Sequence, residues 1–311
     1  MDLDTITVLL SIAIEMGTPL LLASLGEIYA ERAGVLNLGV EGIMSVGAVT
    51  GFVIAYTTNS ALLAIIGAAV VGAMLAAIHG FVTVYLRGNQ IISGLAITMM
   101  GLGISSLIGL PFIGEKIPIL LYEIPIPLLA DIPIIGAFFN QDAIVYLSYA
   151  LTVILWFILF KTRIGYELRA VGESPIVADT AGINVNLVRF LATIFGGALA
   201  GIGGSYYSLV IMKMWIENLT LGKGWIALAL VILALWNPLK ALAGAYLFGF
   251  IDALTIHLQI YGFNVYILGI FPYAITIIVL TLSVIRLKGR EFIGPSALGK
   301  PYIREEEALH G

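Results

Sequence analysis

The sequence predicts an all-α fold, a polytopic bundle of transmembrane helices. Of its 311 residues, 60% are apolar and only 11% are charged, whereas a soluble domain carries roughly 25% charged residues. Most of the apolar residues fall in runs of about 18 to 26, long enough to cross the hydrocarbon core of a bilayer. The N-terminus reads MDLDTI, with acids where a signal peptide has basic residues, so we expect no cleaved leader.

Apolar runs give nine candidate spans in chain order, and a total of eight to ten is compatible with the pattern. The seventh run is short, and its start lies near Leu219 or Trp225. Residues 26–41 are ambiguous and predict a loop, a re-entrant segment or a broken helix. The nine candidates are Ile6–Leu25, Val40–Tyr56, Ala61–Leu86, Ile91–Leu110, Ala143–Phe160, Val188–Ile211, Trp225–Trp236, Leu239–Leu258 and Val265–Ile285.

Basic residues set the orientation through the positive-inside rule. With the N-terminus outside, three of the 15 basic residues lie outside: Lys116, Lys213 and Lys223. The cytoplasmic segments then hold the other twelve: Arg32, Arg87, Lys161, Arg163, Arg169, Arg189, Lys240, Arg286, Lys288, Arg290, Lys300 and Arg304. This asymmetry predicts a multi-pass protein of the cell membrane with a cytoplasmic C-terminus.

The chain divides into one membrane domain, residues 1–290, and a cytoplasmic tail, residues 291–311. Residues 111–141 hold five of the 11 prolines and remain apolar. Proline at that density prevents a continuous helix, so we expect an external loop. It either lies on the bilayer or forms a lid over an outer vestibule.

The sequence offers no catalytic site and no metal site. Cysteine is absent, and the three histidines lie far apart without carboxylates at ligand spacing. Residues 294–300 read GPSALGK, but Pro301 stands where a phosphate-binding loop needs Ser or Thr, and no strand precedes the segment. The net charge of −4 disfavours a nucleic-acid partner. These absences disfavour an enzyme and a resident cofactor.

Residues 161–189 form the longest polar interruption on the cytoplasmic side. Inside it, Ser174 is a predicted N-cap, Pro175 takes the first helical position, and Gly182 follows the end of a short helix. A short exposed helix held between two spans is suited to docking a soluble partner.

Polar side chains within or beside spans mark a candidate cavity or packing contact. Asn37 and Glu41 lie near the ionisable residues Glu27, Glu31 and Arg32, which suggests irregular backbone lining a cavity. Asn89, Ser93 and Thr98 form a polar stripe that must face protein or water. Either interhelical hydrogen bonding or contact with a polar, uncharged solute explains that stripe.

Small residues predict a close helix contact in the sixth span. Gly197, Gly201 and Gly204 follow each other at i, i+4 and i+7, and a stripe without side chains lets a second helix approach. Helix packing is the interpretation that we adopt for them.

Four ordered segments carry a resemblance to a known family. They read GEIYAERAGVLNLGVEGIMSVGA (26–48), NQIISGLAIT (89–98), YELRAVGESPIVADTAGI (166–183) and GKGWIALALVILALWNP (222–238). Together they resemble permease subunits of ABC importers for nucleosides and simple sugars, within the ribose and branched-chain amino acid permease group. One departure is Leu235, where relatives are expected to carry a basic residue.

The resemblance implies an import machine with several partners. Two permeases would form the pore, partner ATPases would bind ATP and Mg below it, and an extracellular binding protein would deliver solute. A homologous second permease is expected, giving a heterodimer, with membrane lipid around both. The segment 169–182 would be the coupling helix, with the ATPase-coupling residues Arg163, Glu167, Arg169, Gly172, Pro175 and Gly182.

The same resemblance favours nucleosides as the solute, moved inward by alternating access. The residues expected along the pathway are Asn37, Glu41, Asn89, Ser93 and Thr98. Three alternatives stay open at this point: a permease for ribose-like sugars, an ion-coupled secondary transporter, and an integral membrane enzyme.

Overall fold

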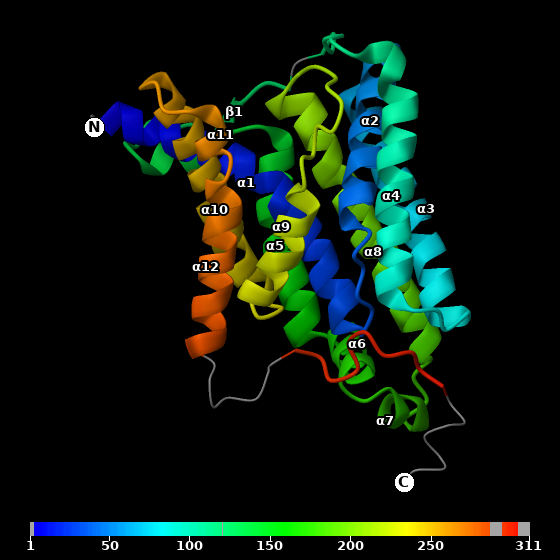
Figure 1. Cartoon of the computed structure of the whole chain (residues 1–311). Coiled ribbons are helices and arrows are strands. Elements are labelled where there is room, and N and C mark those ends of the chain that lie inside the picture. The colour runs from blue at the N-terminus through cyan, green and yellow to red at the C-terminus, as the bar shows by residue number, and fades with distance from the viewer. Residues whose placement is uncertain (1–2, 120, 287–293, 304–311) are drawn as a thin grey trace.

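The fold is a bundle of long helices (Figure 1), described for residues 3–119, 121–286 and 294–303 in a computed structural model. Two very short strands, β1 (Ile124–Pro125) and β2 (Asn140–Gln141), form an antiparallel pair outside the bundle. The all-α prediction is confirmed. The principal helices are α1 (Leu3–Arg32), α2 (Val40–Thr58), α3 (Ala61–Gly80), α4 (Gln90–Gly109), α5 (Ala143–Lys161), α6 (Arg163–Glu173), α7 (Pro175–Thr180), α8 (Val185–Tyr206), α9 (Lys223–Leu233), α10 (Pro238–Ile260), α11 (Val265–Leu268) and α12 (Phe271–Arg286).

The number of full-length spans is smaller than predicted. Within the described residues, seven helices are long and apolar enough to cross a membrane, against nine predicted. The seventh predicted span is the 11-residue helix α9, and the ninth is the 16-residue helix α12. Two spans are extended by one turn of π-helix each, Phe81–Tyr85 after α3 and Tyr207–Ile211 after α8.

Helix α8 lies at the centre of the bundle. Its glycines, which lack side chains, let the backbones of neighbouring helices pack directly against it. A Cβ atom at Gly197 would lie 2.5 Å from the carbonyl oxygen of Gly72, and one at Gly201 would lie 2.2 Å from that of Ala68, both on α3. At Gly204 the carbonyl of Met44 on α2 leaves no room for a side chain. The predicted stripe thus faces α3 and α2, and any larger residue would force these helices apart.

The ambiguous segment 26–41 is partly helical and partly irregular. Helix α1 continues unbroken through Gly26 to Arg32, so the expected break does not occur there. Residues 33–39 then run as irregular backbone to the start of α2 at Val40. Figure 1 shows this segment passing beside α8, with α2 beginning part of the way along the bundle.

A second irregular segment precedes α9. Residues 212–222 follow the π-turn at the end of α8, and Lys116 pairs with Met214 in an isolated β-bridge to the segment 111–141. The left-handed Gly222 (φ +79°) starts α9, so α9 spans only part of the bundle (Figure 1).

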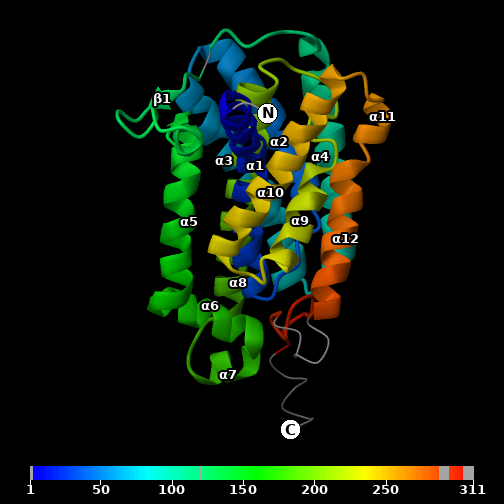
Figure 2. The same cartoon turned by 90° about the vertical axis from the view of Figure 1, so that its left-hand side faces the viewer.

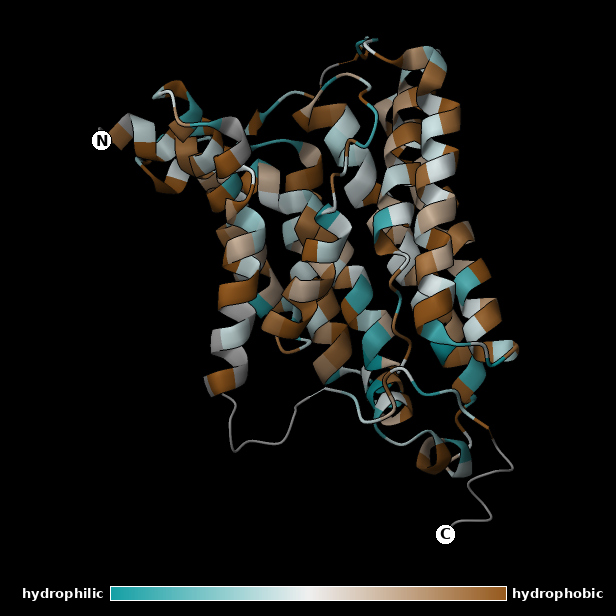
Figure 3. Cartoon of the chain, viewed as in Figure 1, coloured by the Kyte–Doolittle hydropathy of each residue, from teal (hydrophilic) through white to brown (hydrophobic). Residues whose placement is uncertain are grey.

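The two ends of the bundle differ in character. One end carries the segment 111–141, which contains 3₁₀ turns and exposed apolar side chains such as Leu128 (82% exposed). The other end carries α6, α7 and residues 294–303, and hydrophilic residues gather there (Figure 3). Figure 2 shows α5 at the edge of the bundle, above α6. Parts of the predicted tail, residues 291–293 and 304–311, lie outside the described residues.

Candidate solute pathway and coupling surface

The irregular segment 33–39 is held by polar side chains from three helices. The Leu36 N–H donates to Gln90 Oε1 (2.7 Å), and the Leu36 carbonyl lies 3.1 Å from His79 Nε2. The Asn37 N–H donates to Glu27 Oε1 (3.0 Å). Buried backbone groups without such partners would each cost roughly 1–3 kcal/mol. These side chains therefore allow the chain to leave helical structure inside the bundle.

The predicted pathway residues of α4 are divided by the structure. Thr98 is buried, and its hydroxyl donates to the Leu38 carbonyl (2.8 Å). Ser93 lies 3.0 Å from His79 Nδ1, whereas exposed Asn89 caps α4 by accepting from the Ile92 N–H (3.0 Å). Ser93 and Thr98 thus lie near the irregular segment, and Asn89 lies at the helix end.

Buried Glu41, in the first turn of α2, holds the beginning of α9. Its Oε1 accepts from the Thr220 hydroxyl (2.6 Å) and the Gly222 N–H (2.9 Å), and its Oε2 accepts from the Gly224 N–H (2.6 Å). The carboxylate therefore satisfies N–H groups that α9 leaves free at its N-terminus, where negative charge is also favoured. Asn37 accepts from Gly39 (2.9 Å) nearby and shapes the approach to α2.

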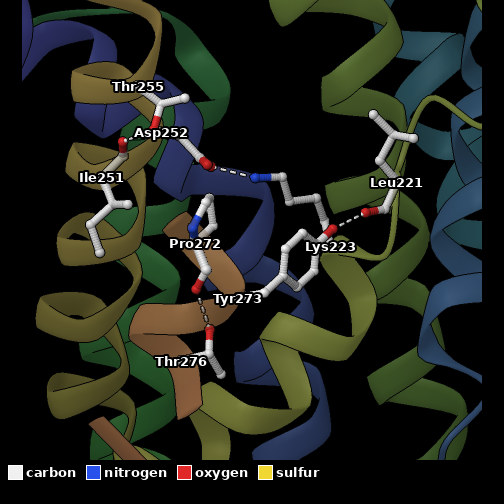
Figure 4. A network of polar contacts seen from close by, with 8 residues as sticks. All are labelled: Leu221, Lys223, Ile251, Asp252, Thr255, Pro272, Tyr273 and Thr276. Carbon is white, nitrogen blue, oxygen red and sulfur yellow. Dashed lines mark hydrogen bonds and ion pairs between the residues drawn. The ribbon is translucent and has the colours of Figure 1, made fainter. Parts of the chain in front are cut away.

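The same turn of α9 is bound from α10 and α12 (Figure 4). Lys223 Nζ forms an ion pair with Asp252 Oδ2 of α10 (2.5 Å), and the Tyr273 hydroxyl of α12 donates to the Leu221 carbonyl (2.5 Å). Residues 220–224, which we call the α9 turn, are thus held by α2, α10 and α12 together.

The α9 turn is only partly covered by the rest of the chain. The side chains of Lys223 and Asp252 are 18% and 13% exposed, and the neighbouring Tyr273 is 42% exposed. The buried Tyr207 hydroxyl is within electrostatic range of Asp252, Glu41 and Tyr273, and it has no hydrogen-bond partner among the described residues. Charged groups at this depth are costly against lipid, so this face is suited to water, solute or another protein.

At the opposite end, the segment 161–189 folds as two short helices where one was predicted. The predicted coupling helix 169–182 is divided between the end of α6 and the whole of α7. Ser174 is the N-cap of α7, Pro175 its first residue, and Gly182 has φ +84° just beyond its end. Ile176 and Val177 are 40% and 65% exposed, which gives α7 an apolar outer surface.

The charged residues of α6 have partners within the chain. Arg163 pairs with Glu167 one turn away (2.7 Å). The Arg169 guanidinium lies over the rings of Phe160 (5.3 Å) and Tyr166 (4.8 Å). These contacts fix the orientation of α6 against the end of α5.

Gly172 marks the point at which α6 is fastened to the bundle. A Cβ atom there would lie 2.0 Å from the Arg32 carbonyl oxygen at the end of α1. The Gly172 carbonyl accepts from the Ala297 N–H (2.9 Å), and Ser296 donates to Glu173 Oε1 (2.6 Å).

Residues 294–303, which we call the C-terminal clasp, extend this attachment. The Gly299 N–H donates to the Gly34 carbonyl (3.3 Å). Buried Arg189 of α8 donates to the carbonyls of Lys300 (3.0 Å) and Ala33 (3.1 Å). The clasp thus joins α6, α8 and the irregular segment 33–39.

The chain matches known transport proteins over nearly its whole length. Residues 9–280 match the family described as branched-chain amino acid transport system / permease component. The chain belongs to this permease family. It is therefore a multi-pass membrane transport component rather than an enzyme in its own right.

Three similar permeases cover almost the complete chain. The protein of Haloferax volcanii named "Putative glucose ABC transporter permease protein TsgC13" is 40% identical over 96% of this chain and 98% of its own. The guanosine ABC transporter permease protein NupQ of Bacillus subtilis is 37% identical over 92% and 93%. The nucleoside ABC transporter permease protein NupC of Lactococcus lactis is 34% identical over 97% and 99%.

Weaker matches come from the same two organisms as TsgC13 and NupC. The nucleoside ABC transporter permease protein NupB of Lactococcus lactis is 34% identical over 31% of this chain and 27% of its own. The glucose ABC transporter permease protein TsgB13 of Haloferax volcanii is 28% identical over 60% and 53%.

Sequence reasoning missed several residues that shape this permease. Lys223 was assigned to an external connection, although it pairs with Asp252 inside the bundle. A lysine and an aspartate in separate apolar segments are a usable signal, because each alone would be costly in a membrane. Arg189 and the C-terminal clasp were also missed, and their contacts join backbone carbonyls far apart in sequence, which no motif reveals.

Proposed function

We propose that this permease forms one half of an ATP-driven importer for nucleosides in the cell membrane. Support for the substrate comes from NupQ and NupC, whose names give guanosine and nucleosides. The candidate pathway also suits a neutral polar solute, since it combines one ion pair with hydroxyl groups. A sugar is the second candidate, because TsgC13 and TsgB13 are both named for glucose transport.

Partner ATPases would dock on α6 and α7 from the cytoplasm and bind ATP and Mg themselves. The single observation that carries this proposal is the attachment of α6: Gly172 lies against the end of α1 without room for a Cβ atom. Because α6 packs so closely against α1, a displacement of α6 would also displace the end of α1. The exposed apolar side chains of α7, Ile176 and Val177, supply a surface for the partner.

Motion would reach the pathway along the chain itself. A displaced α6 carries the end of α1 and, through the C-terminal clasp, the segment 33–39. That segment leads directly into α2, whose Glu41 holds the α9 turn. Alternating access would follow when α2 moves relative to α10 and α12, which hold the same turn from the other side.

The complete importer would contain a second, different permease and an extracellular binding protein. Two permease proteins each from Lactococcus lactis and from Haloferax volcanii match this chain, which favours a heterodimer. In this arrangement the C-terminus is cytoplasmic, and the partly exposed α9 turn faces the other permease.

The test is reconstitution with the partner ATPase, second permease and binding protein. Nucleosides should stimulate ATP hydrolysis and uptake in vesicles. Gly172→Asp and Arg169→Glu should abolish both while leaving membrane insertion unchanged. Gly262→Asn is a matched control outside α6 and α7, because Gly262 has open space around it and asparagine tolerates its positive φ.

Two outcomes would overturn the proposal. Normal uptake by both variants would remove α6 and α7 as the docking surface. Accumulation of nucleoside with an ion gradient alone, without a hydrolysable triphosphate, would instead assign the chain to ion-coupled transport.

A further inference from the structure

An apolar hollow of about 410 Å³ opens between α5 and α8 on the side of the bundle above α6. Its walls are the last turns of α5, with Leu155 and Ile158, and the first turns of α8, with Leu191 and Phe195. Tyr29 of α1 and Leu168 of α6 complete it. The hollow therefore lies at the level where the spans meet the cytoplasmic surface.

The lining provides nothing that would favour a polar occupant. Tyr29 and Glu167 are its only residues with polar side-chain groups. The Tyr29 hydroxyl donates to the Leu155 carbonyl (2.7 Å), and Glu167 is paired with Arg163. An alkyl chain matches such a surface, because it needs no hydrogen bonds and fills apolar space.

Two basic residues adjoin the lining in the chain. Lys161 ends α5, three residues after the lining residue Ile158, and is exposed. Arg163 directly precedes Ile164, which lines the hollow and is 66% exposed. The Arg163 side chain is 92% exposed and pairs with Glu167 of the lining, so Lys161 leaves this border with a net positive charge. Flexible cationic side chains beside an apolar slot at the cytoplasmic surface match a lipid with an anionic headgroup. Lysine is depleted in protein–protein interfaces, so Lys161 favours a lipid over a protein as the occupant.

We propose that one anionic phospholipid binds here, with an acyl chain in the hollow and its phosphate at Lys161 and Arg163. The lipid would fill the space between α5 and α8 and press on the apolar side of α6. It would thereby support the position of the helix that is fastened at Gly172. The proposal concerns lipid binding alone and does not depend on which solute the permease carries.

The test is native mass spectrometry of the full-length permease in detergent, titrated with palmitoyl-oleoyl phosphatidylglycerol or with phosphatidylcholine of the same chains. The wild-type chain should retain phosphatidylglycerol preferentially. Lys161→Ala and Arg163→Ala should each weaken that binding about fivefold, the usual contribution of one basic residue near an anionic headgroup. Lys240→Ala is the matched control, an exposed basic residue on α10, a helix that contributes nothing to the lining.

A second variant tests the hollow independently of charge. Ala192 lines it and is buried, so Ala192→Phe should fill the space and lower the binding of both lipids. Ala96→Phe makes the same change in a different apolar hollow, beside Asn89, and should leave this binding unchanged. Thermal unfolding of each variant checks that the chain remains folded.

Three results would overturn the proposal. Equal retention of the two lipids by the wild-type chain would remove the anionic preference. Unchanged binding in the Lys161→Ala, Arg163→Ala double variant or in Ala192→Phe would place the lipid elsewhere. A photocrosslinker at Leu191 that captures the second permease and no lipid would show that protein fills the hollow.

Discussion

The permease interrupts its helices twice inside the bundle, and the two interruptions are stabilised by different chemistry. The segment 33–39 is held mostly by neutral groups, such as those of Gln90, His79 and Thr98, and it is largely buried. Two ionisable side chains, Glu27 and Arg189, also bind its backbone. The α9 turn is held by Glu41 and by the pair Lys223–Asp252, and it is partly exposed. The enclosed hydrogen bonds of segment 33–39 suit a part of the chain that keeps one conformation. The partly exposed charges of the α9 turn suit a part whose contacts change during transport.

Replacing Glu41 should have the largest effect, because it is the only charged link between α2 and α9 among the bonds described. Glu41→Ala removes three hydrogen bonds to a carboxylate, each worth about 1.5–3 kcal/mol. We expect a strong fall in thermal stability in detergent and no uptake. Glu123→Ala, an exposed glutamate in the segment 111–141, is the control. Equal stability of the two variants would contradict the importance of this link.

Breaking the Lys223–Asp252 pair tests whether the α9 turn serves transport or stability alone. Either single change, Asp252→Asn or Lys223→Met, leaves one charge without its partner and should destabilise the chain by about 3 kcal/mol. The double variant Lys223→Met, Asp252→Leu should regain most of that stability but remain deficient in uptake. If the double variant regains uptake as well as stability, the ion pair serves stability alone. The α9 turn would then not differ from segment 33–39 in having a role in transport.

A change at the fixed joint should affect stability more than solute choice. Gln90→Leu leaves the Leu36 N–H without its 2.7 Å acceptor, which should cost about 1–3 kcal/mol. The relative uptake of different nucleosides should stay the same. Competition assays with a nucleoside panel check this point, and altered selectivity would assign segment 33–39 to the pathway.

The smallest effect is expected at Thr98. Thr98→Val keeps the shape of the side chain and removes one bond to the Leu38 carbonyl, at a cost of about 1 kcal/mol. Uptake should remain close to that of the wild type. A large loss of affinity for solute, measured as an increased KM, would restore Thr98 to the pathway predicted from the sequence.

Hydrophobic runs predicted most of the long helices, because a span must be apolar over its whole length. Pro175 marked the start of α7, because proline fits the first helical position. Ser174 stands at the N-cap position but makes no side-chain cap hydrogen bond. The hydrophobic runs overestimated α9 because hydropathy cannot show that residues 212–222 enter the bundle as irregular backbone. Long-range partners such as Glu41 and Gly222 were equally hidden, since 181 residues separate them.

The clasp also bears on the order in which the protein matures. Residues 294–303 are synthesised after every helix of the bundle, yet they provide the acceptor for Arg189 and the donor to Gly172. This end of the bundle therefore reaches its finished form only at the last stage of translation. A chain cut before residue 294 should insert normally but lack the bonds from this segment to Gly172 and Arg189.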